Sequence, residues 1–123
     1  DQMGSLTSAF SLANACWRSI ENFSINSFDR KNSSILHFSD KGITSWFDVA
    51  IEIGKKANKI GLLSKTAFVD PIKSSEYPTV AKRPNYSVLE CTKTYEKLGI
   101  EPINWKKSIE DIIRFIKVKK LLK

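Results

Sequence analysis

Residues 76–93 read EYPTVAKRPNYSVLECTK, and this stretch decides how the rest of the chain is interpreted. Pro78 and Pro84 have no amide hydrogen, and each forces the residue before it toward extended backbone. Residues 77–89 are therefore predicted to form an ordered loop, because a regular helix does not tolerate two such breaks. After the loop, residues 92–98 are predicted to form a short helix that the following glycine closes. This loop is the most distinctive part of the chain.

Three longer helices are predicted outside the loop. Apolar residues at three- and four-residue spacing predict an amphipathic helix over residues 7–22. Ser45 and Asp48 form a capping-box-like start for a second helix, whose apolar stripe continues until Gly61 serves as the C-cap. The last helix begins near Trp105 and carries isoleucines on one face.

Two short strands are predicted between the helices. Residues 33–38 include three apolar side chains after a polar turn, which is typical of a buried strand. Residues 68–72 are a second candidate, which Pro71 restricts to a sheet edge or a strand end. The chain has 123 residues, 41% of them hydrophobic, so a single domain over residues 1–123 is expected. The predicted class is α/β, rich in helix, with few short strands.

Composition narrows the expected location of the protein. No apolar run approaches the roughly 18 residues of a membrane span, and no charged and apolar leader opens the sequence. We therefore expect a cytoplasmic protein without a membrane partner. Cys16 and Cys91 are far apart and form no C-x-x-C motif, which favours two buried thiols over a disulfide.

The net charge is +7, and the terminal segment carries most of it. Residues 106–123 contain seven basic and two acidic residues. A basic helix can bind nucleic acid, but base stacking needs aromatic residues among the charges, and only Phe115 lies there. A solvated helix face is the simpler interpretation, so nucleic acid is not an expected partner. A basic polyanion-binding module stays as one alternative function.

Four segments, taken in order, resemble the C-terminal part of dTDP-4-dehydrorhamnose reductases, which are extended short-chain dehydrogenase/reductases. They are DQxGSxT at residues 1–7 with the helix after it, HF at 37–38, GITSWFDVA at 42–50, and the stretch 76–93 with LGI at 98–100 and Trp105. The resemblance implies the helix-rich C-terminal substrate-binding portion of such an enzyme, with the nucleotide-binding Rossmann portion mostly absent. One departure is Leu6, where the family usually has proline.

The resemblance also implies a function for the full-length enzyme. Such enzymes reduce dTDP-4-dehydro-L-rhamnose to dTDP-L-rhamnose with NADPH or NADH, for cell-surface polysaccharide. The cofactor needs a glycine-rich turn, but the five glycines here are too far apart to form one. The proton donor of the family is a Tyr-x-x-x-Lys pair, and none of the three tyrosines has a lysine four residues later. The chain is therefore expected to be an inactive C-terminal piece of a longer enzyme, without catalytic, cofactor-binding or metal-binding residues.

Arg83 is the first candidate for substrate contact. Related nucleotide-sugar enzymes place this Arg-Pro loop near the sugar nucleotide, and a guanidinium can hold two phosphate oxygens. The alternative is an arginine that supports its own loop. Gln2, Ser5 and Thr7 lie in the segment that the family places beside the substrate pocket, where they could bind sugar hydroxyls. For each of these residues, a local role in a turn or a helix cap is as good an explanation as substrate contact. Thr7 in particular could cap the helix that follows it.

Other residues with chemical potential are expected to be structural. His37 is the only histidine, and it has no partner at ligand spacing. Trp46 and Trp105, at predicted helix starts, are expected to pack against other residues and not to form ligand platforms.

The expected partners follow from the resemblance. A dTDP-sugar would be the ligand, and the missing N-terminal nucleotide-binding half would be the other partner. Without that half, uncovered apolar surface would favour self-association. A second alternative function is a non-catalytic relative similar to the regulatory subunit of methionine adenosyltransferase, which acts by binding a partner enzyme. An intact glycine turn and Tyr-x-x-x-Lys pair in the missing half would distinguish the reductase from this relative.

Overall fold

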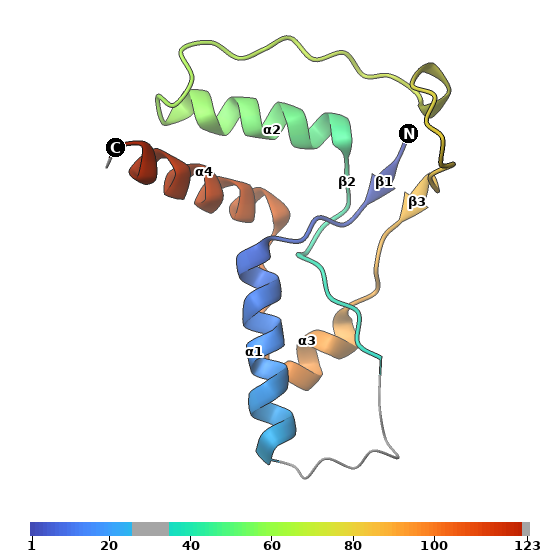
Figure 1. The fold of residues 1–123 in the computed structure, drawn as a ribbon, viewed down its shortest axis with the longest axis vertical. Coiled ribbons are helices and arrows are strands. Elements are labelled where there is room, and N and C mark those ends of the chain that lie inside the picture. Colours follow the sequence, from blue (N-terminus) through green and yellow to red (C-terminus); the bar gives the residue numbers. More distant parts are fainter. Residues whose placement is uncertain (26–34, 122–123) are drawn as a thin grey trace.

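The computed structural model describes residues 1–25 and 35–121 of the chain (Figure 1). Its helices are α1 (Ala9–Ile25), α2 (Trp46–Lys59), α3 (Thr92–Leu98) and α4 (Trp105–Leu121), with a short 3-10 helix, η2 (Ser74–Glu76). Its strands are β1 (Met3–Gly4), β2 (Thr44–Ser45) and β3 (Tyr86–Ser87). The predicted helix-rich class with few short strands is confirmed.

The helices form two pairs. In Figure 1, α2 and α4 lie side by side, and α1 extends away from them with α3 against its flank. The three short strands lie together beside the start of α2, and the long segment after α2 runs back along that helix to reach β3. This arrangement leaves the strands and the loop around residue 83 on one side of the molecule.

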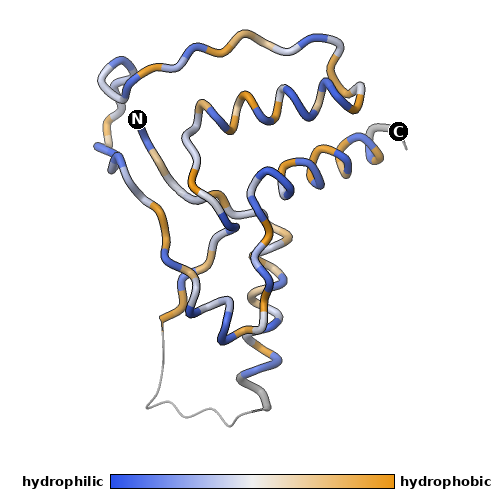
Figure 2. The backbone as a smooth tube through the Cα atoms, turned by 180° about the vertical axis from the view of Figure 1, so that it is seen from behind, coloured by the Kyte–Doolittle hydropathy of each residue, from blue (hydrophilic) through white to orange (hydrophobic). Residues whose placement is uncertain are grey.

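The hydrophobic core lies between α2 and α4. It is formed by Val49 and Ala57 of α2 and by Trp105, Ile109 and Ile113 of α4. The four-residue spacing in α4 places its three core residues on one face, and Trp105 packs as predicted. Figure 2 shows hydrophobic positions recurring along both helices. Because a buried large apolar side chain contributes about 1.5–3 kcal/mol, this contact is the main support of the fold.

Local signals set the helix boundaries. Ser45 Oγ accepts the amide N–H of Asp48 at 3.1 Å, and the Asp48 carboxylate accepts the amide N–H of Ser45 at 3.3 Å, so the predicted capping box is confirmed. These hydrogen bonds with Ser45 lower the pKa of Asp48. The C-cap of α2 is Ile60, and the predicted Gly61 follows it with φ +71°. Gly99 ends α3 with φ +61°, as predicted.

The predicted apolar face of α1 is not buried. Phe10, Trp17 and Ile20 are 62%, 63% and 56% exposed, whereas Ala15 is buried. The reason is that α1 meets the short helix α3, which covers only a narrow strip of its surface. Cys16 is also exposed, so the expectation of two buried thiols is wrong for this residue. Both cysteines are free, and Cys91 is buried as expected.

Both predicted strands are wrong in the part of the chain that the structure describes. Residues 35–38 and 68–72 have no strand structure, and residues 33 and 34 lie outside the described residues. The observed sheet has the order β2-β1-β3. Met3 of β1 pairs with Ser45 in the antiparallel direction and with Tyr86 in the parallel direction. An apolar run forms a strand only where another strand pairs with it. Here β1 pairs with β2 and β3, and not with residues 35–38 or 68–72.

Large apolar side chains are abundant on the surface of the described residues. Across residues 1–25 and 35–121, no helix combines the length and the hydropathy needed to cross a bilayer. The exposed side chains of α1 are the type of surface that favours association. Self-association stays a prediction, which light scattering of the purified chain would test.

Candidate functional site

The short sheet brings together three segments that are far apart in the sequence. Met3 N donates to the Asn85 carbonyl at 2.8 Å, which fixes the start of the chain beside the loop that contains Arg83. On its other side, β1 pairs with β2, directly before the capping box of α2. The opening segment, the start of α2 and the Arg-Pro loop therefore surround one region of surface.

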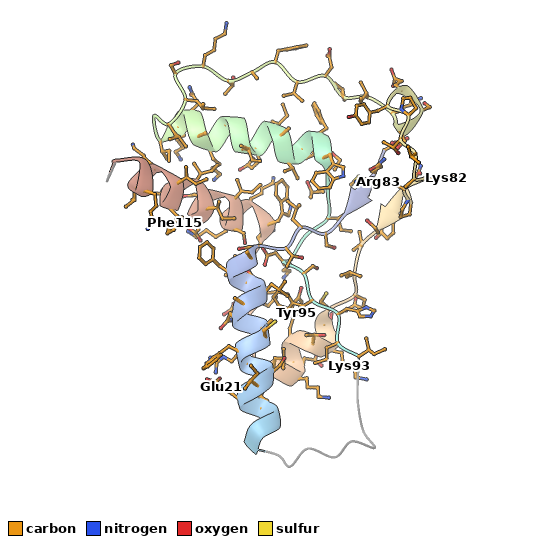
Figure 3. All side chains as sticks on the ribbon, in the orientation of Figure 1. Glu21, Lys82, Arg83, Lys93, Tyr95 and Phe115 are labelled. Atoms are coloured by element: carbon orange, nitrogen blue, oxygen red, sulfur yellow. The ribbon has the colours of Figure 1, made fainter. Side chains whose placement is uncertain are left out.

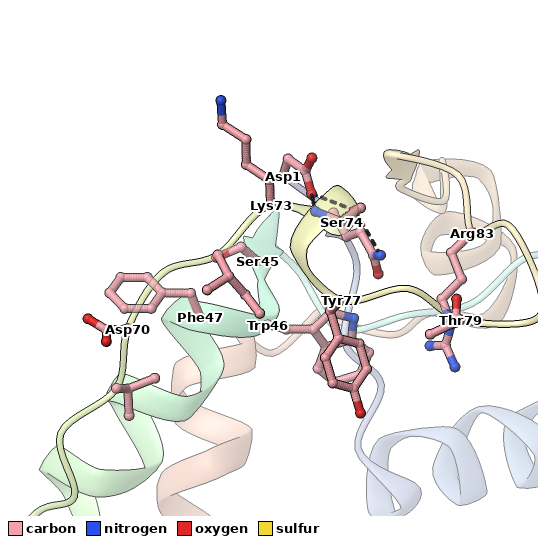
Figure 4. Close-up of a pocket in the computed structure, with 13 residues that line it drawn as sticks. Asp1, Ser45, Trp46, Phe47, Asp70, Lys73, Ser74, Tyr77, Thr79 and Arg83 are labelled. Atoms are coloured by element: carbon pink, nitrogen blue, oxygen red, sulfur yellow. Dashed lines mark hydrogen bonds between the residues drawn. The ribbon is translucent and has the colours of Figure 1, made fainter.

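A pocket of about 440 Å³, here called the Arg83 pocket, occupies this region (Figure 4). Its lining residues are Asp1, Gln2, Ser45, Trp46, Phe47, Val69, Asp70, Ile72, Lys73, Ser74, Tyr77, Thr79 and Arg83. In Figure 4, Arg83 and Thr79 lie on one side of Trp46 and Tyr77, and Phe47 lies on the other. The pocket therefore combines aromatic walls with polar side chains at its edges.

Arg83 lies where two pockets meet. An adjoining pocket of about 370 Å³ also contains Arg83, together with Gln2, Ser45 and Trp46. In the described part of the chain, the Arg83 side chain forms no hydrogen bond and no ion pair. Its guanidinium donors are therefore available to a ligand. The neighbouring Lys82 lines neither pocket and points away from β1 (Figure 3).

Gln2 lines both pockets, but its amide is already used. Gln2 Nε2 donates to Ser74 Oγ at 3.0 Å, and Ser74 Oγ donates to Asp1 Oδ1 at 2.6 Å. Ser74 N also donates to Asp1 Oδ1, at 2.9 Å. The opening residues therefore hold the η2 turn through Ser74, and the Gln2 carbonyl oxygen is the part of the side chain left for a ligand.

The other two predicted substrate residues differ in their positions. Ser5 lines the adjoining pocket, where its Oγ accepts the amide N–H of Leu89 at 3.3 Å. Thr7 is exposed and lines neither pocket. Thr7 does not cap α1 either, because Ser8 Oγ is the group that accepts the amide N–H of Phe10, at 3.2 Å. The structure thus groups Arg83, Gln2 and Ser5 and leaves Thr7 apart.

Trp46 and Tyr77 are pocket residues that sequence reasoning missed. Trp46 was expected to be a packing residue, but it is 62% exposed and lines both pockets. It is the first residue of α2, directly after the cap Ser45. Tyr77 is 69% exposed and lines the Arg83 pocket. In the sequence, Trp46 follows a helix cap and Tyr77 precedes a proline. Neither position shows by itself whether the aromatic side chain is buried or exposed.

The chemistry of the Arg83 pocket suits recognition of a charged, ring-containing ligand. Arg83 and Lys73 supply positive charge, and Asp1 and Asp70 supply negative charge at the rim. Aromatic faces such as that of Trp46 bind rings by stacking. A guanidinium binds phosphate oxygens in pairs. In the described residues, no group of three or more metal-ligating side chains occurs.

The hydroxyl of Tyr95 is engaged outside the Arg83 pocket. Its hydroxyl donates to the Ser39 carbonyl at 2.7 Å, away from the Arg83 pocket. Burial, with a smaller contribution from Cys91, raises the pKa of Tyr95 to about 12. A catalytic tyrosine needs the opposite shift, toward the working pH. The role of Tyr95 is therefore to hold α3 against the segment that precedes β2 (Figure 3).

Comparisons with known proteins agree on one family. The family model described as the RmlD substrate binding domain matches residues 1–118. A dTDP-4-dehydrorhamnose reductase from Aggregatibacter actinomycetemcomitans is 37% identical over 78 residues, which are 63% of this chain and 26% of that protein. A dTDP-4-dehydrorhamnose reductase from Sinorhizobium fredii is 31% identical over 113 residues, covering 92% of this chain and 37% of that protein.

A solved structure supports the fold as well. The crystal structure of a dTDP-4-dehydrorhamnose reductase, an RfbD ortholog from Clostridium acetobutylicum, matches with a TM-score of 0.74 and 32% identity. The match covers 95% of this chain and 37% of that one. The chain thus spans between 26% and 37% of the length of the two curated relatives described above.

Proposed function

The chain belongs to the RmlD substrate-binding domain family, and on that premise we propose that it binds the sugar nucleotide in a dTDP-4-dehydrorhamnose reductase. In the whole enzyme, NADPH or NADH would reduce the C4 keto group of dTDP-4-dehydro-L-rhamnose to give dTDP-L-rhamnose. The residues of this chain would supply the pocket walls and the orientation of the substrate. The observation that carries the proposal is the Arg83 pocket, which the family-like segments build together.

The described residues of this chain do not fit a nicotinamide dinucleotide. A dinucleotide places its pyrophosphate at a helix N-terminus that follows a strand. Here α1 follows β1, but the amide N–H of Ser8 before α1 is taken by Asp40 Oδ2 at 3.0 Å. That carboxylate would repel a pyrophosphate.

The proposed role of the pocket follows from the positions of its groups. The Arg83 guanidinium would bind the phosphates, because its donors have no other partner in the described chain. The faces of Trp46 and Tyr77 would contact the flat or ring parts of the ligand. Ser45 and Thr79 offer hydroxyl groups at the edge of the same pocket.

Titration of the purified chain tests the proposal. We expect dTDP-L-rhamnose to shift the Trp46 indole N–H signal in NMR spectra and to saturate. L-rhamnose alone should bind more weakly, because it has no phosphate for Arg83. Absence of any shift, or equal shifts with L-rhamnose alone, would contradict sugar-nucleotide binding at this pocket.

The polyanion-binding alternative gains no support from α4. Lys107 Nζ lies 2.6 Å from Asp111 Oδ1, and Arg114 lies 2.8 Å from Glu110. Lys117 Nζ donates to the Ile60 carbonyl. These basic side chains are thus committed to local contacts. Retention on heparin that falls with salt and does not depend on Arg83 would favour the alternative.

A further inference from the structure

One wall of the Arg83 pocket comes from residues 65–84, which contain Ile72, Tyr77 and Arg83. Apart from the short turn η2, this segment has neither helix nor strand, and it crosses from the end of α2 to β3 (Figure 1). Without regular structure, such a segment depends on individual contacts for its position.

Ser74 is the point at which this segment is attached. Among the residues that the structure describes, every hydrogen bond between residues 65–84 and the rest of the chain is made by Ser74. The next attachments lie at the ends, where Asn58 Nδ2 donates to the carbonyls of Leu63 and Ser64, and Met3 N donates to Asn85.

The attachment is a directed chain of hydrogen bonds. The Gln2 amide donates to the Ser74 hydroxyl, which donates in turn to the Asp1 carboxylate (Figure 4). A hydroxyl that accepts and donates at once strengthens both bonds, since each polarises the other. The charged acceptor makes the short 2.6 Å bond between Ser74 and Asp1 the stronger of the two.

Hydrogen bonds within residues 73–77 link Ser74 to its neighbours that line the pocket. Lys73 N donates to Glu76 Oε2 at 2.7 Å, and Glu76 N donates to the Lys73 carbonyl at 2.9 Å. Tyr77 N donates to the Ser74 carbonyl at 3.3 Å. Because η2 is closed on itself in this way, fixing Ser74 also fixes Lys73 and Tyr77, which flank it and line the pocket.

We propose that Ser74 is a positioning residue for ligand binding, which Asp1 and Gln2 hold so that the segment 65–84 stays in place as a pocket wall. This inference rests on the proposed function of the Arg83 pocket. It also gives Gln2 a different role from the one expected from the sequence, because its amide acts through Ser74 and not on the sugar.

Hydrogen–deuterium exchange of the unliganded chain tests the attachment itself. In Ser74→Ala, the hydrogen-bonded backbone amides of Lys73, Glu76 and Tyr77, in and beside η2, should exchange about ten-fold faster, since the anchoring bonds of the hydroxyl are lost. Amides of α2 and α4 should be unchanged. Ser75→Ala is the matched control, because Ser75 is the next residue of the same turn and is exposed. Ser74→Thr, which keeps the hydroxyl, should restore slow exchange.

Titration with dTDP-L-rhamnose tests the consequence for binding. Affinity should fall about five- to ten-fold in Ser74→Ala and in Gln2→Ala, and it should stay near the wild-type value in Ser75→Ala and Ser74→Thr. Unchanged exchange in Ser74→Ala would overturn the proposal. Faster exchange with unchanged affinity would overturn it too, because the attachment would then not serve binding.

The two proposals fail in different ways. If the wild-type chain does not bind the sugar nucleotide, the proposed function is refuted and the positioning role falls with it, whereas the exchange experiment still decides whether Ser74 anchors the segment. If the wild-type chain binds and Ser74→Ala behaves like wild type, the proposed function stands and the positioning role is refuted.

Discussion

Arg83 and Lys82 are adjacent basic residues in different surroundings. Arg83 lines the Arg83 pocket and the adjoining pocket, whereas Lys82 lines neither. Both residues are exposed. What separates them is the direction in which each side chain leaves the loop (Figure 3).

Arg83→Ala should weaken the affinity for dTDP-L-rhamnose by about 1.5–3 kcal/mol, the scale of a hydrogen bond to a charged group. Lys82→Ala removes a charge of the same sign one residue away and should leave the affinity nearly unchanged. Isothermal titration of both variants measures the difference. Equal losses would mean that the loop attracts the ligand only through its overall charge.

Gly42 and Gly61 are a matched pair for testing backbone strain. Both have positive φ, +109° and +71°, but a Cβ at Gly42 would lie 2.8 Å from Trp105 Cδ1, whereas a Cβ at Gly61 would meet nothing within 4 Å. Gly61→Ala should cost about 1–2 kcal/mol from backbone conformation alone. Gly42→Ala should cost about 2–5 kcal/mol, because the buried Trp105 must also move. Urea unfolding of both variants checks this order, which equal values would contradict.

At the scale of elements, a cluster of charged side chains links α2 to α4 beside the hydrophobic core. Glu110 of α4 lies 2.8 Å from Lys56 of α2 and 2.8 Å from Arg114 one turn later. Lys56 also lies 3.7 Å from Glu52. The hydrogen bonds from Lys56 and then Arg114 lower the pKa of Glu110 to about 2. The bond to Glu110 raises the pKa of Lys56.

Glu110→Gln should lower the melting temperature at neutral pH and change its pH dependence. The folded pKa of about 2 lies below the ordinary value of 4.5, so the carboxylate stabilises the folded chain above pH 4.5. That stabilisation is lost as pH falls through about 2. Thermal unfolding should therefore show a difference between wild type and variant that is constant above pH 4.5 and shrinks toward pH 2. Glu101→Gln, on the exposed connection before α4, is the control and should show no such dependence.

At the scale of the whole molecule, the chain should have no reductase activity by itself. Its sequence contains neither a glycine-rich turn for the dinucleotide nor a Tyr-x-x-x-Lys pair for the proton. Incubation of the purified chain with NADPH and dTDP-4-dehydro-L-rhamnose should leave the absorbance at the NADPH band unchanged. Turnover that survives Arg83→Ala would reveal a contaminating enzyme, and turnover that Arg83→Ala abolishes would refute the prediction.

Much of the helical architecture could be predicted from local sequence. The capping box of Ser45 and Asp48, the stop at Gly99 and the spacing from Trp105 onward each depend on residues within one or two turns. The strands could not be predicted, because each has two residues and exists only through its partner. The apolar stripe of α1 was misleading, since periodicity predicts a helix but does not show whether another element covers its face.

The sequence by itself determined the helix-rich class, the family resemblance and the presence of Arg83 in an irregular loop, because these depend on neighbouring residues and recognisable motifs. Only the tertiary structure decided that Trp46 is exposed beside Arg83, that Thr7 lies apart, and that the Gln2 amide is engaged by Ser74. These outcomes depend on how segments far apart in the sequence meet, as Gln2 meets Ser74, and such pairings leave no periodic signal in a single sequence.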